Sequence, residues 1–134
     1  MDTAATRVLL VDDEPSLLKL VSAYLRRLGY TVTTANTTEK AWTEMESALA
    51  SGNGAYAVAV LDATMPGLSM NELAERMLKA SNSLRILTSS GYPVDIGPLE
   101  EAAPGRVAFL HKPFTPEMLA ATVRRMLAPQ EEDV

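Results

Sequence analysis

Three aspartates, a serine and a lysine stand out in this sequence because each lies just beyond a short apolar run. They are Asp12, Asp13, Asp62, Ser90 and Lys112. Two carboxylates about 4 Å apart repel each other by roughly 4 kcal/mol at an effective dielectric constant near 20, so three that converge need a cation or a proton. Carboxylate oxygens without histidine or cysteine favour Mg²⁺, which takes one or two carboxylates and keeps several water molecules. If the fold gathers these residues, they predict a magnesium site.

An aspartate beside Mg²⁺ and a lysine can also act as a nucleophile toward phosphorus. Its attack gives an aspartyl phosphate. The metal, the lysine and a hydroxyl group would share the negative charge of the transferred phosphoryl oxygens. These residue types therefore favour phosphoryl transfer to a carboxylate.

Each residue also has a purely structural alternative. The alternatives are a helix cap for Asp12 or Asp13, a turn for Asp62 and for Ser90-Gly91, and a loop for Lys112-Pro113. The single histidine, His111, is expected to be exposed or at an edge, without a catalytic role. The joint occurrence of the other residues, in this order after apolar runs, favours the functional interpretation.

Four apolar runs do not alternate with polar residues, which predicts strands buried on both faces of a parallel sheet. They are Val8–Val11, Val58–Leu61, Leu84–Leu87 and Val107–Leu110. In a fifth segment, Tyr30, Val32 and Thr34 alternate with Thr31, Thr33 and Ala35, which predicts a strand at the edge of the sheet.

The segments between the runs have helical periodicity. Apolar residues recur at helical spacing in Leu17–Leu28, in residues 37 to 50, around Leu73 and Met77, and in Leu119–Met126. Gly29 is a stop signal for the first helix, while Thr115 and Pro116 can cap and open the last. The segment Pro93–Pro104 contains three prolines and Gly97, so its helix is expected to be one or two turns long or poorly ordered.

Five strands alternating with five helices predict an α/β fold with a doubly wound, five-stranded parallel sheet. Ligands of such sheets bind outside the carboxyl ends of the strands, where the winding direction switches. The five candidate residues all come at these ends.

Composition excludes several other classes of protein. The chain has 134 residues, the size of one domain, and its net charge of −5 opposes direct binding to nucleic acid or anionic lipid. It has no cysteine, and no apolar stretch near the roughly 20 residues of a membrane span. It also lacks the Gly-x-x-x-x-Gly-Lys-Ser/Thr loop of many nucleotide-binding enzymes. A cytoplasmic location is expected.

Together these motifs resemble the receiver domain of two-component response regulators. The matching segments are Val11–Pro15, Leu61–Gly67, Ser90–Tyr92 and Phe109–Phe114. The resemblance spans about residues 6 to 128 and leaves 129–134 as an acidic C-terminal tail. It implies the (βα)5, flavodoxin-like receiver fold and a role as phosphoacceptor in a phosphorelay.

The resemblance also implies a role for each site residue. Asp62 would be the phosphoacceptor, and Mg²⁺ would be held by the carboxylates of Asp13 and Asp62, by the backbone carbonyl of Thr64, and by Asp12 mainly through water. Lys112 would pair with a phosphoryl oxygen, Ser90 would be the hydroxyl switch residue, and Phe109 would be the rotating aromatic. The Lys112-Pro113 bond is expected to be cis.

Two features depart from the family pattern. Met70 stands where receivers usually have glycine, eight residues after Asp62, which is expected to alter the turn into the third helix. The proline- and glycine-rich fourth helix belongs to the face that forms the active dimer in many regulators, so a monomer is expected here. Thr64 and Tyr92 occupy positions that tune phosphate lifetime in the family.

The expected donor is a histidine kinase or a histidine phosphotransfer protein. The receiver would catalyse only its own phosphorylation and dephosphorylation. The Ser90–Tyr92 and Ala108–Thr115 segments resemble receivers of hybrid histidine kinases, and a stand-alone response regulator is the alternative. A pseudo-receiver that binds partners without phosphorylation is a remote alternative. A phosphatase of the haloacid dehalogenase type would need a second aspartate at position 64, where this chain has Thr64.

Overall fold

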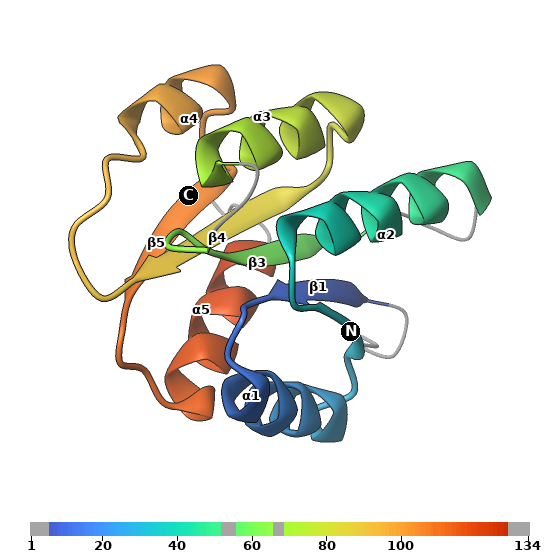
Figure 1. Ribbon diagram of the computed structural model, residues 1–134, viewed down its shortest axis with the longest axis vertical. Helices are drawn as coiled ribbons and strands as arrows, with labels where there is room; N and C mark the ends of the chain where they lie inside the picture. Colours follow the sequence, from blue (N-terminus) through green and yellow to red (C-terminus); the bar gives the residue numbers. More distant parts are fainter. Residues whose placement is uncertain (1–5, 52–55, 66–68, 129–134) are drawn as a thin grey trace.

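The computed structural model describes residues 6–51, 56–65 and 69–128 (Figure 1). The strands are β1 (Arg7–Val11), β2 (Thr31–Ala35), β3 (Val58–Asp62), β4 (Arg85–Ser90) and β5 (Val107–His111). The helices are α1 (Pro15–Arg27), α2 (Thr38–Ser51), α3 (Met70–Ala80), α4 (Gly97–Ala102) and α5 (Pro116–Leu127). The predicted alternation of strand and helix is confirmed. The predicted tail, residues 129–134, and the motif residues Pro66 and Gly67 lie outside the described residues.

The five strands form one parallel sheet in the order β2-β1-β3-β4-β5. Helices α1 and α5 pack on one face, and α2, α3 and α4 cover the other (Figure 1). This is the doubly wound fold that the sequence predicts, and β2 lies at an edge as expected. The predicted alternation of buried and exposed side chains in β2 does not reach the end of the strand. Thr34 is exposed, whereas Ala35 is buried on the α2 side of the sheet.

The sheet is buried on both faces because successive side chains of a strand point to opposite sides. In β1, Leu9 and Val11 join the core beneath α2 and α3, while Val8 and Leu10 join the core beneath α1 and α5. Burying one such side chain contributes about 1.5–3 kcal/mol. The two cores hold the central strands in fixed register, and so fix where the strands end.

Local sequence signals set the helix ends. Thr115 caps α5 by accepting a hydrogen bond from the Met118 N–H, and Pro116 occupies the first turn, both as predicted. Gly29 follows α1 with a φ of 103°, which glycine adopts without strain. Ser69 caps α3, so Met70 begins that helix and is buried. Helix α4 has only six residues, which confirms the prediction of a short helix.

Three strands extend further than the apolar runs predict. Asp62 is the last residue of β3, His111 is the last residue of β5, and β4 continues through Thr88 to Ser90. The hydroxyl residues of β4 stay in the sheet because Ser89 and Ser90 pair with Leu110 and His111 of β5. The Thr88 hydroxyl also donates to the Ala108 carbonyl. Ser90 therefore belongs to the strand rather than to a turn. None of the described helices is long and apolar enough to cross a membrane.

Candidate functional site

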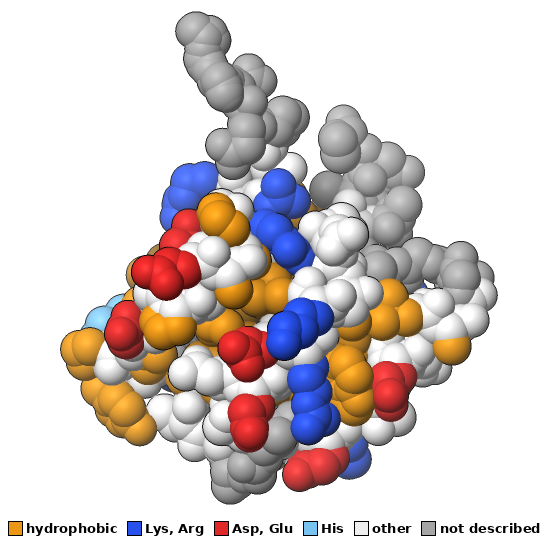
Figure 2. All heavy atoms as spheres, turned by 90° about the horizontal axis from the view of Figure 1, so that it is seen from above, with side chains coloured by type: hydrophobic (Ala, Val, Ile, Leu, Met, Phe, Trp, Pro, Cys, Tyr) orange, Lys and Arg blue, Asp and Glu red, His pale blue; other side chains and the backbone are white. Residues whose placement is uncertain are grey.

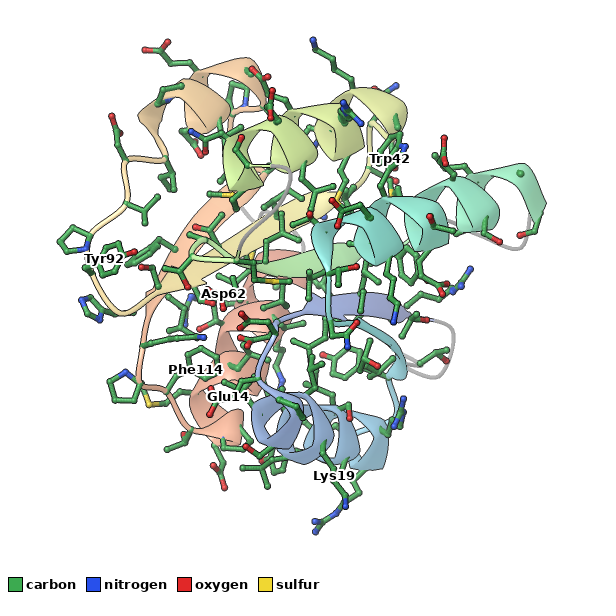
Figure 3. All side chains as sticks on the ribbon, viewed as in Figure 1. Glu14, Lys19, Trp42, Asp62, Tyr92 and Phe114 are labelled. Carbon is green, nitrogen blue, oxygen red and sulfur yellow. The ribbon has the colours of Figure 1, made fainter. Side chains whose placement is uncertain are left out.

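The carboxyl ends of β1, β3 and β5 bring the predicted aspartates and lysine together. Asp12 and Asp62 are only 2% and 4% exposed. Lys112 Nζ lies 2.9 Å from Asp12 Oδ2 and 3.3 Å from Asp62 Oδ2, so one ammonium group bridges both carboxylates. In Figure 3, Asp62 lies at the end of the sheet where Glu14, Tyr92 and Phe114 also lie, away from Trp42.

The second oxygen of Asp62 is held by Thr64. Asp62 Oδ1 accepts hydrogen bonds from the Thr64 backbone N–H at 3.0 Å and from the Thr64 hydroxyl at 2.8 Å. Both carboxylate oxygens of Asp62 therefore have fixed partners. The sequence predicted that the Thr64 carbonyl is a metal ligand and that position 64 tunes phosphate lifetime. It did not predict the hydrogen bond from the Thr64 hydroxyl to Asp62. A threonine two residues after a strand-ending aspartate is a signal for such a bond.

Asp13 completes an acidic cluster. Carboxylate oxygens of Asp12, Asp13 and Asp62 all lie within 4.8 Å of one another, and Asp13 is exposed while the other two are buried. Asp12 does not cap α1. Its Oδ1 accepts from the Glu14 N–H at 2.9 Å, and α1 has no side-chain cap. Three hard oxygen donors beside an open face fit Mg²⁺, because one exposed carboxylate leaves room for water ligands.

The electrostatics of the cluster show an excess of negative charge. Burial raises the pKa of Asp12, and the charge of Asp62 adds to that rise against the opposing bonds from Lys112 and Glu14. Burial alone would lower the pKa of Lys112, but its hydrogen bonds and charge interactions with Asp12 and Asp62 outweigh burial and raise it. The Lys112 ammonium thus pairs with two of the three clustered carboxylates, and the site favours a further cation.

The two predicted switch residues lie on the neighbouring strands. Ser90 is fully buried, and its hydroxyl accepts a hydrogen bond from the Tyr92 N–H at 3.1 Å rather than contacting Asp62. The Ser90 carbonyl accepts from the Lys112 N–H at 2.8 Å, which ties β4 to the lysine. Phe109 is half-buried and meets His111 edge-on, with ring centroids 5.9 Å apart. His111 is exposed, as expected.

The peptide bond between Lys112 and Pro113 is cis, as the resemblance predicts. Every predicted site residue lies on β1, β3, β4 or β5, or is the first or second residue after one of these strands. A family model described as the response regulator receiver domain matches residues 8–124. The chain belongs to this receiver domain family.

Relatives of this receiver occur in more than one kind of protein. The chain is 30% identical over 129 residues to the sensor kinase CckA of Brucella abortus, covering 96% of this chain but 13% of that protein. It is also 30% identical over 135 residues to the DNA-binding response regulator MtrA of Mycolicibacterium smegmatis, covering 99% of this chain and 55% of MtrA. The receiver thus spans about half or less of these relatives.

A solved structure gives the same fold with ligands bound. The response regulator TrrA of Thermotoga maritima, in complex with Mg²⁺ and BeF, superposes with a TM-score of 0.73 at 29% identity. The match covers 91% of this chain and 99% of TrrA. Receiver domains bind Mg²⁺ at a cluster of aspartates and take phosphoryl groups from histidine kinases, and Asp12, Asp13 and Asp62 form such a cluster here.

Proposed function

We propose that Asp62 of this receiver accepts a phosphoryl group from a phosphohistidine donor in the presence of Mg²⁺. The observation that carries the proposal is the placement of the Asp62 carboxylate. It is buried at the end of β3, held by Lys112 and Thr64, and lies in the same cluster as Asp12 and Asp13. A carboxylate fixed in this way approaches phosphorus in one orientation, which lowers the entropic cost of attack.

The reaction exchanges one bond to phosphorus for another. A carboxylate oxygen of Asp62 forms the O–P bond as the N–P bond of the donor phosphohistidine breaks, and the electron pair of that bond returns to the imidazole nitrogen. The Lys112 ammonium, already 3.3 Å from Asp62 Oδ2, is placed to pair with a phosphoryl oxygen. The Ser90 hydroxyl would donate to another phosphoryl oxygen after leaving the Tyr92 N–H.

The carboxylates of Asp13 and Asp62, the carbonyl of Thr64 and, through water, Asp12 would hold the metal. When bound, Mg²⁺ neutralises charge that develops on the phosphoryl oxygens. The chemistry of the donor set supports this assignment, since all the proposed ligands are oxygens and Lys112 pairs with only two of the three clustered carboxylates among the described residues.

The surface that would change is the segment after Ser90 together with β5. A move of the Ser90 hydroxyl toward the phosphoryl group would break its bond to the Tyr92 N–H and free the segment that Tyr92 begins. Tyr92 is 61% exposed. Figure 2 shows hydrophobic side chains beside the pale blue histidine. Phe109, beside His111, would turn inward into the space that Ser90 leaves.

For the context of the receiver, we propose a hybrid histidine kinase in the cytoplasm, with a stand-alone response regulator as the alternative. The segments Ser90–Tyr92 and Ala108–Thr115 and the similarity to a sensor kinase support the first. The partner would be a histidine kinase or histidine phosphotransfer protein, with no direct contact to nucleic acid or membrane. Because α4 has six residues, we propose a monomer.

Labelling with a small phosphodonor tests the proposed chemistry. Acetyl phosphate should add one phosphoryl group per chain in Mg²⁺, and Asp62→Ala should abolish the addition. Intact-mass spectrometry measures the stoichiometry. Labelling that survives Asp62→Ala, or that proceeds equally in EDTA, would contradict the proposed roles.

Phosphotransfer profiling tests the proposed partner and context. The receiver is mixed with purified, prephosphorylated kinases and phosphotransfer proteins, and the initial rates are compared. Fast transfer from a kinase fused to a receiver of this sequence supports the hybrid context, whereas transfer from a separate kinase alone supports the stand-alone regulator. Size-exclusion chromatography with light scattering, with and without beryllofluoride, measures the oligomeric state.

A further inference from the structure

Two arginines lie side by side at the opposite edge of the sheet, where the strands begin. Arg85 is the first residue of β4, and Arg106 immediately precedes β5. The Ile86 N–H donates to the Arg106 carbonyl at 2.8 Å, and Ile86 is in register with Val107. The backbones of the two arginines are therefore direct neighbours across adjacent strands, where like charges are unfavourable.

Arg106 has a structural role that accounts for its position. Its guanidinium donates to the carbonyls of Leu78, Ser81 and Leu84, and so ties β5 to the end of α3. Such carbonyls carry partial negative charge at a helix C-terminus, which favours a cation. Burial and then the charge of Arg85 lower the pKa of Arg106. Arg106 is thus satisfied by hydrogen bonds but still repelled by its neighbour.

Arg85 has no comparable explanation. Its Nε–H is buried and has no hydrogen-bond partner. Within residues 6–51, 56–65 and 69–128, no carboxylate forms an ion pair with Arg85 or with Arg106. A buried donor without a partner costs free energy, and a guanidinium that also faces a second cation costs more. The two arginines therefore form no ion pair with a carboxylate of the described residues.

We propose that Arg85, next to Arg106, binds an oxyanion, either a carboxylate or a phosphate-like group. The planar guanidinium fork matches both by paired hydrogen bonds. One source is in the chain itself, where Glu131, Glu132 and Asp133 follow α5. Leu84 and Ile86 face the α2–α3 side and Leu87 the α1–α5 side, so alternation places Arg85 on the face that α5 covers. The second source is an anion from solution.

The chain length allows the internal source. Helix α5 begins after the carboxyl end of β5 and returns along the sheet, so it ends at the edge where β4 begins. Glu131 lies four residues beyond Leu127, the last residue of α5, a reach of up to roughly 13 Å. Binding there would place the acidic residues beside Arg85, on the face that α5 covers, and away from the aspartate cluster.

The test follows the Nε–Hε NMR resonance of Arg85 during a titration with sodium sulfate in EDTA, at ionic strength held constant with sodium chloride. The full chain is compared with a triple variant, Glu131→Gln, Glu132→Gln and Asp133→Asn. Arg124, exposed in the last turn of α5, is the internal control. EDTA keeps the aspartate cluster free of metal, so sulfate bound there with a metal does not contribute.

Two results would support the site and distinguish its sources. If the tail is the ligand, the triple variant shifts the Arg85 resonance and binds sulfate at least about tenfold more tightly than the full chain, because the internal competitor is gone. If the anion comes from solution, sulfate shifts the Arg85 resonance saturably and equally in both proteins.

A third result would overturn the proposal. In this result, neither the triple substitution nor sulfate moves the Arg85 resonance more than the Arg124 resonance. A thermal denaturation series gives a second measurement that does not rely on resonance assignment. Sulfate should raise the Tm of the triple variant above the value in chloride, and adding Arg85→Gln should abolish that difference. An undiminished difference would also contradict the site.

Discussion

Charged residues of opposite sign lie at the two edges of the sheet, and they differ in their ion-pair partners. At the carboxyl edge, three aspartates form a cluster, and the Lys112 ammonium pairs with two of them, Asp12 and Asp62. At the amino edge, Arg85 and Arg106 are neighbours, and neither pairs with a carboxylate of the described residues. The described carboxylates at the first edge outnumber the lysine that pairs with them, and the arginines at the second edge have no described carboxylate as an ion-pair partner.

The comparison teaches that helix ends and ligands both determine which charge an edge can hold. In an α/β sheet, helix N-termini lie near the carboxyl edge and favour anions, while helix C-termini lie near the amino edge and favour cations. This preference explains the sign of the charge at each edge but does not neutralise that charge. We therefore expect a cation to complete the first edge and an anion the second, with chemistry only where a nucleophile, Asp62, is present.

The largest expected effect is loss of the cation at the carboxyl edge. EDTA should abolish labelling by acetyl phosphate, and Asp13→Asn should raise the Mg²⁺ concentration for half-maximal labelling by at least about tenfold, because a carboxylate ligand is lost. Asp13 is exposed, so the substitution should leave the free energy of unfolding unchanged. Glu14→Gln, the exposed neighbour outside the cluster, is the matched control. An equal effect of both substitutions would contradict the assignment of Asp13.

Removing the lysine should separate metal binding from the surface change. Lys112→Ala should retain Mg²⁺ binding but lose the chemical-shift response of the Tyr92 segment to beryllofluoride, since no ammonium remains to pair with the phosphoryl mimic. Without metal, the unfolding free energy should fall by about 1–2 kcal/mol, less than for a fully buried pair because Lys112 is one-fifth exposed.

Lys79→Ala, at an exposed position in the last turn of α3, is the control for loss of a lysine elsewhere. A beryllofluoride response of Lys112→Ala equal to that of the unmodified chain would count against a role for this lysine in coupling.

As pH falls, Mg²⁺ binding at the carboxyl edge should weaken at a higher pH than it would if Asp12 had the ordinary pKa of an aspartate. Burial raises the pKa of Asp12 above 3.8, so its proton competes with the metal as pH falls through the raised pKa, by up to about tenfold in affinity per pH unit. In EDTA, the stability that this protonated carboxyl contributes is present below pH 3.8 and is lost as pH rises through the raised pKa.

Urea denaturation with and without Mg²⁺, over a pH series, measures both effects. Stabilisation by Mg²⁺ should grow as pH rises from acid toward neutrality. Stabilisation that is independent of pH would mean that Asp12 does not take part.

A smaller effect is expected from the hydroxyl that holds the nucleophile. Thr64→Val removes the 2.8 Å hydrogen bond to Asp62 Oδ1 but retains the backbone bond. Because that bond helps to fix the carboxylate in the orientation for attack, labelling at saturating Mg²⁺ should become several-fold slower. Thr64→Ser keeps the hydroxyl and should keep the original rate. Equal rates in all three proteins would show that the hydroxyl is only structural.

The last prediction concerns stability alone and separates the two arginines of the amino edge. Arg106→Met should lower the unfolding free energy by about 2–3 kcal/mol, because three carbonyl bonds are lost. Arg85→Met should change it by less than about 1 kcal/mol, because its Nε–H has no partner to lose. Urea denaturation in chloride measures both. A large loss for Arg85→Met would mean that this side chain already has a strong partner in the folded chain.

Much of the fold could be predicted because burial on both faces leaves a simple pattern. The apolar runs predicted the strands β1, β3, β4 and β5, and the alternating segment predicted β2 at the edge. Thr115 and Gly29 marked helix ends through local chemistry that does not depend on the rest of the chain. The strand ends were less predictable. Ser90 extends β4 because it pairs with β5, a contact far away in sequence.

The aspartates and lysine could be predicted to meet because parallel strands end at one edge of the sheet. The hydrogen-bond or ion-pair partner of each side-chain atom could not be predicted. The ammonium of Lys112 lies closer to Asp12 than to Asp62, and the Thr64 hydroxyl holds Asp62, because side-chain rotamers and packing decide these contacts. Arg85 and Arg106 are 21 positions apart and carry no motif, so only strand register makes them neighbours.

The central claim is that Asp62 becomes the aspartyl phosphate. Borohydride reduces an acyl phosphate to the alcohol, so treatment after labelling with acetyl phosphate and Mg²⁺ converts the modified aspartate to homoserine. Peptide mass spectrometry should find homoserine at position 62, and none when Mg²⁺ is withheld. Homoserine at Asp12 or Asp13, or at position 62 regardless of metal, would contradict the claim.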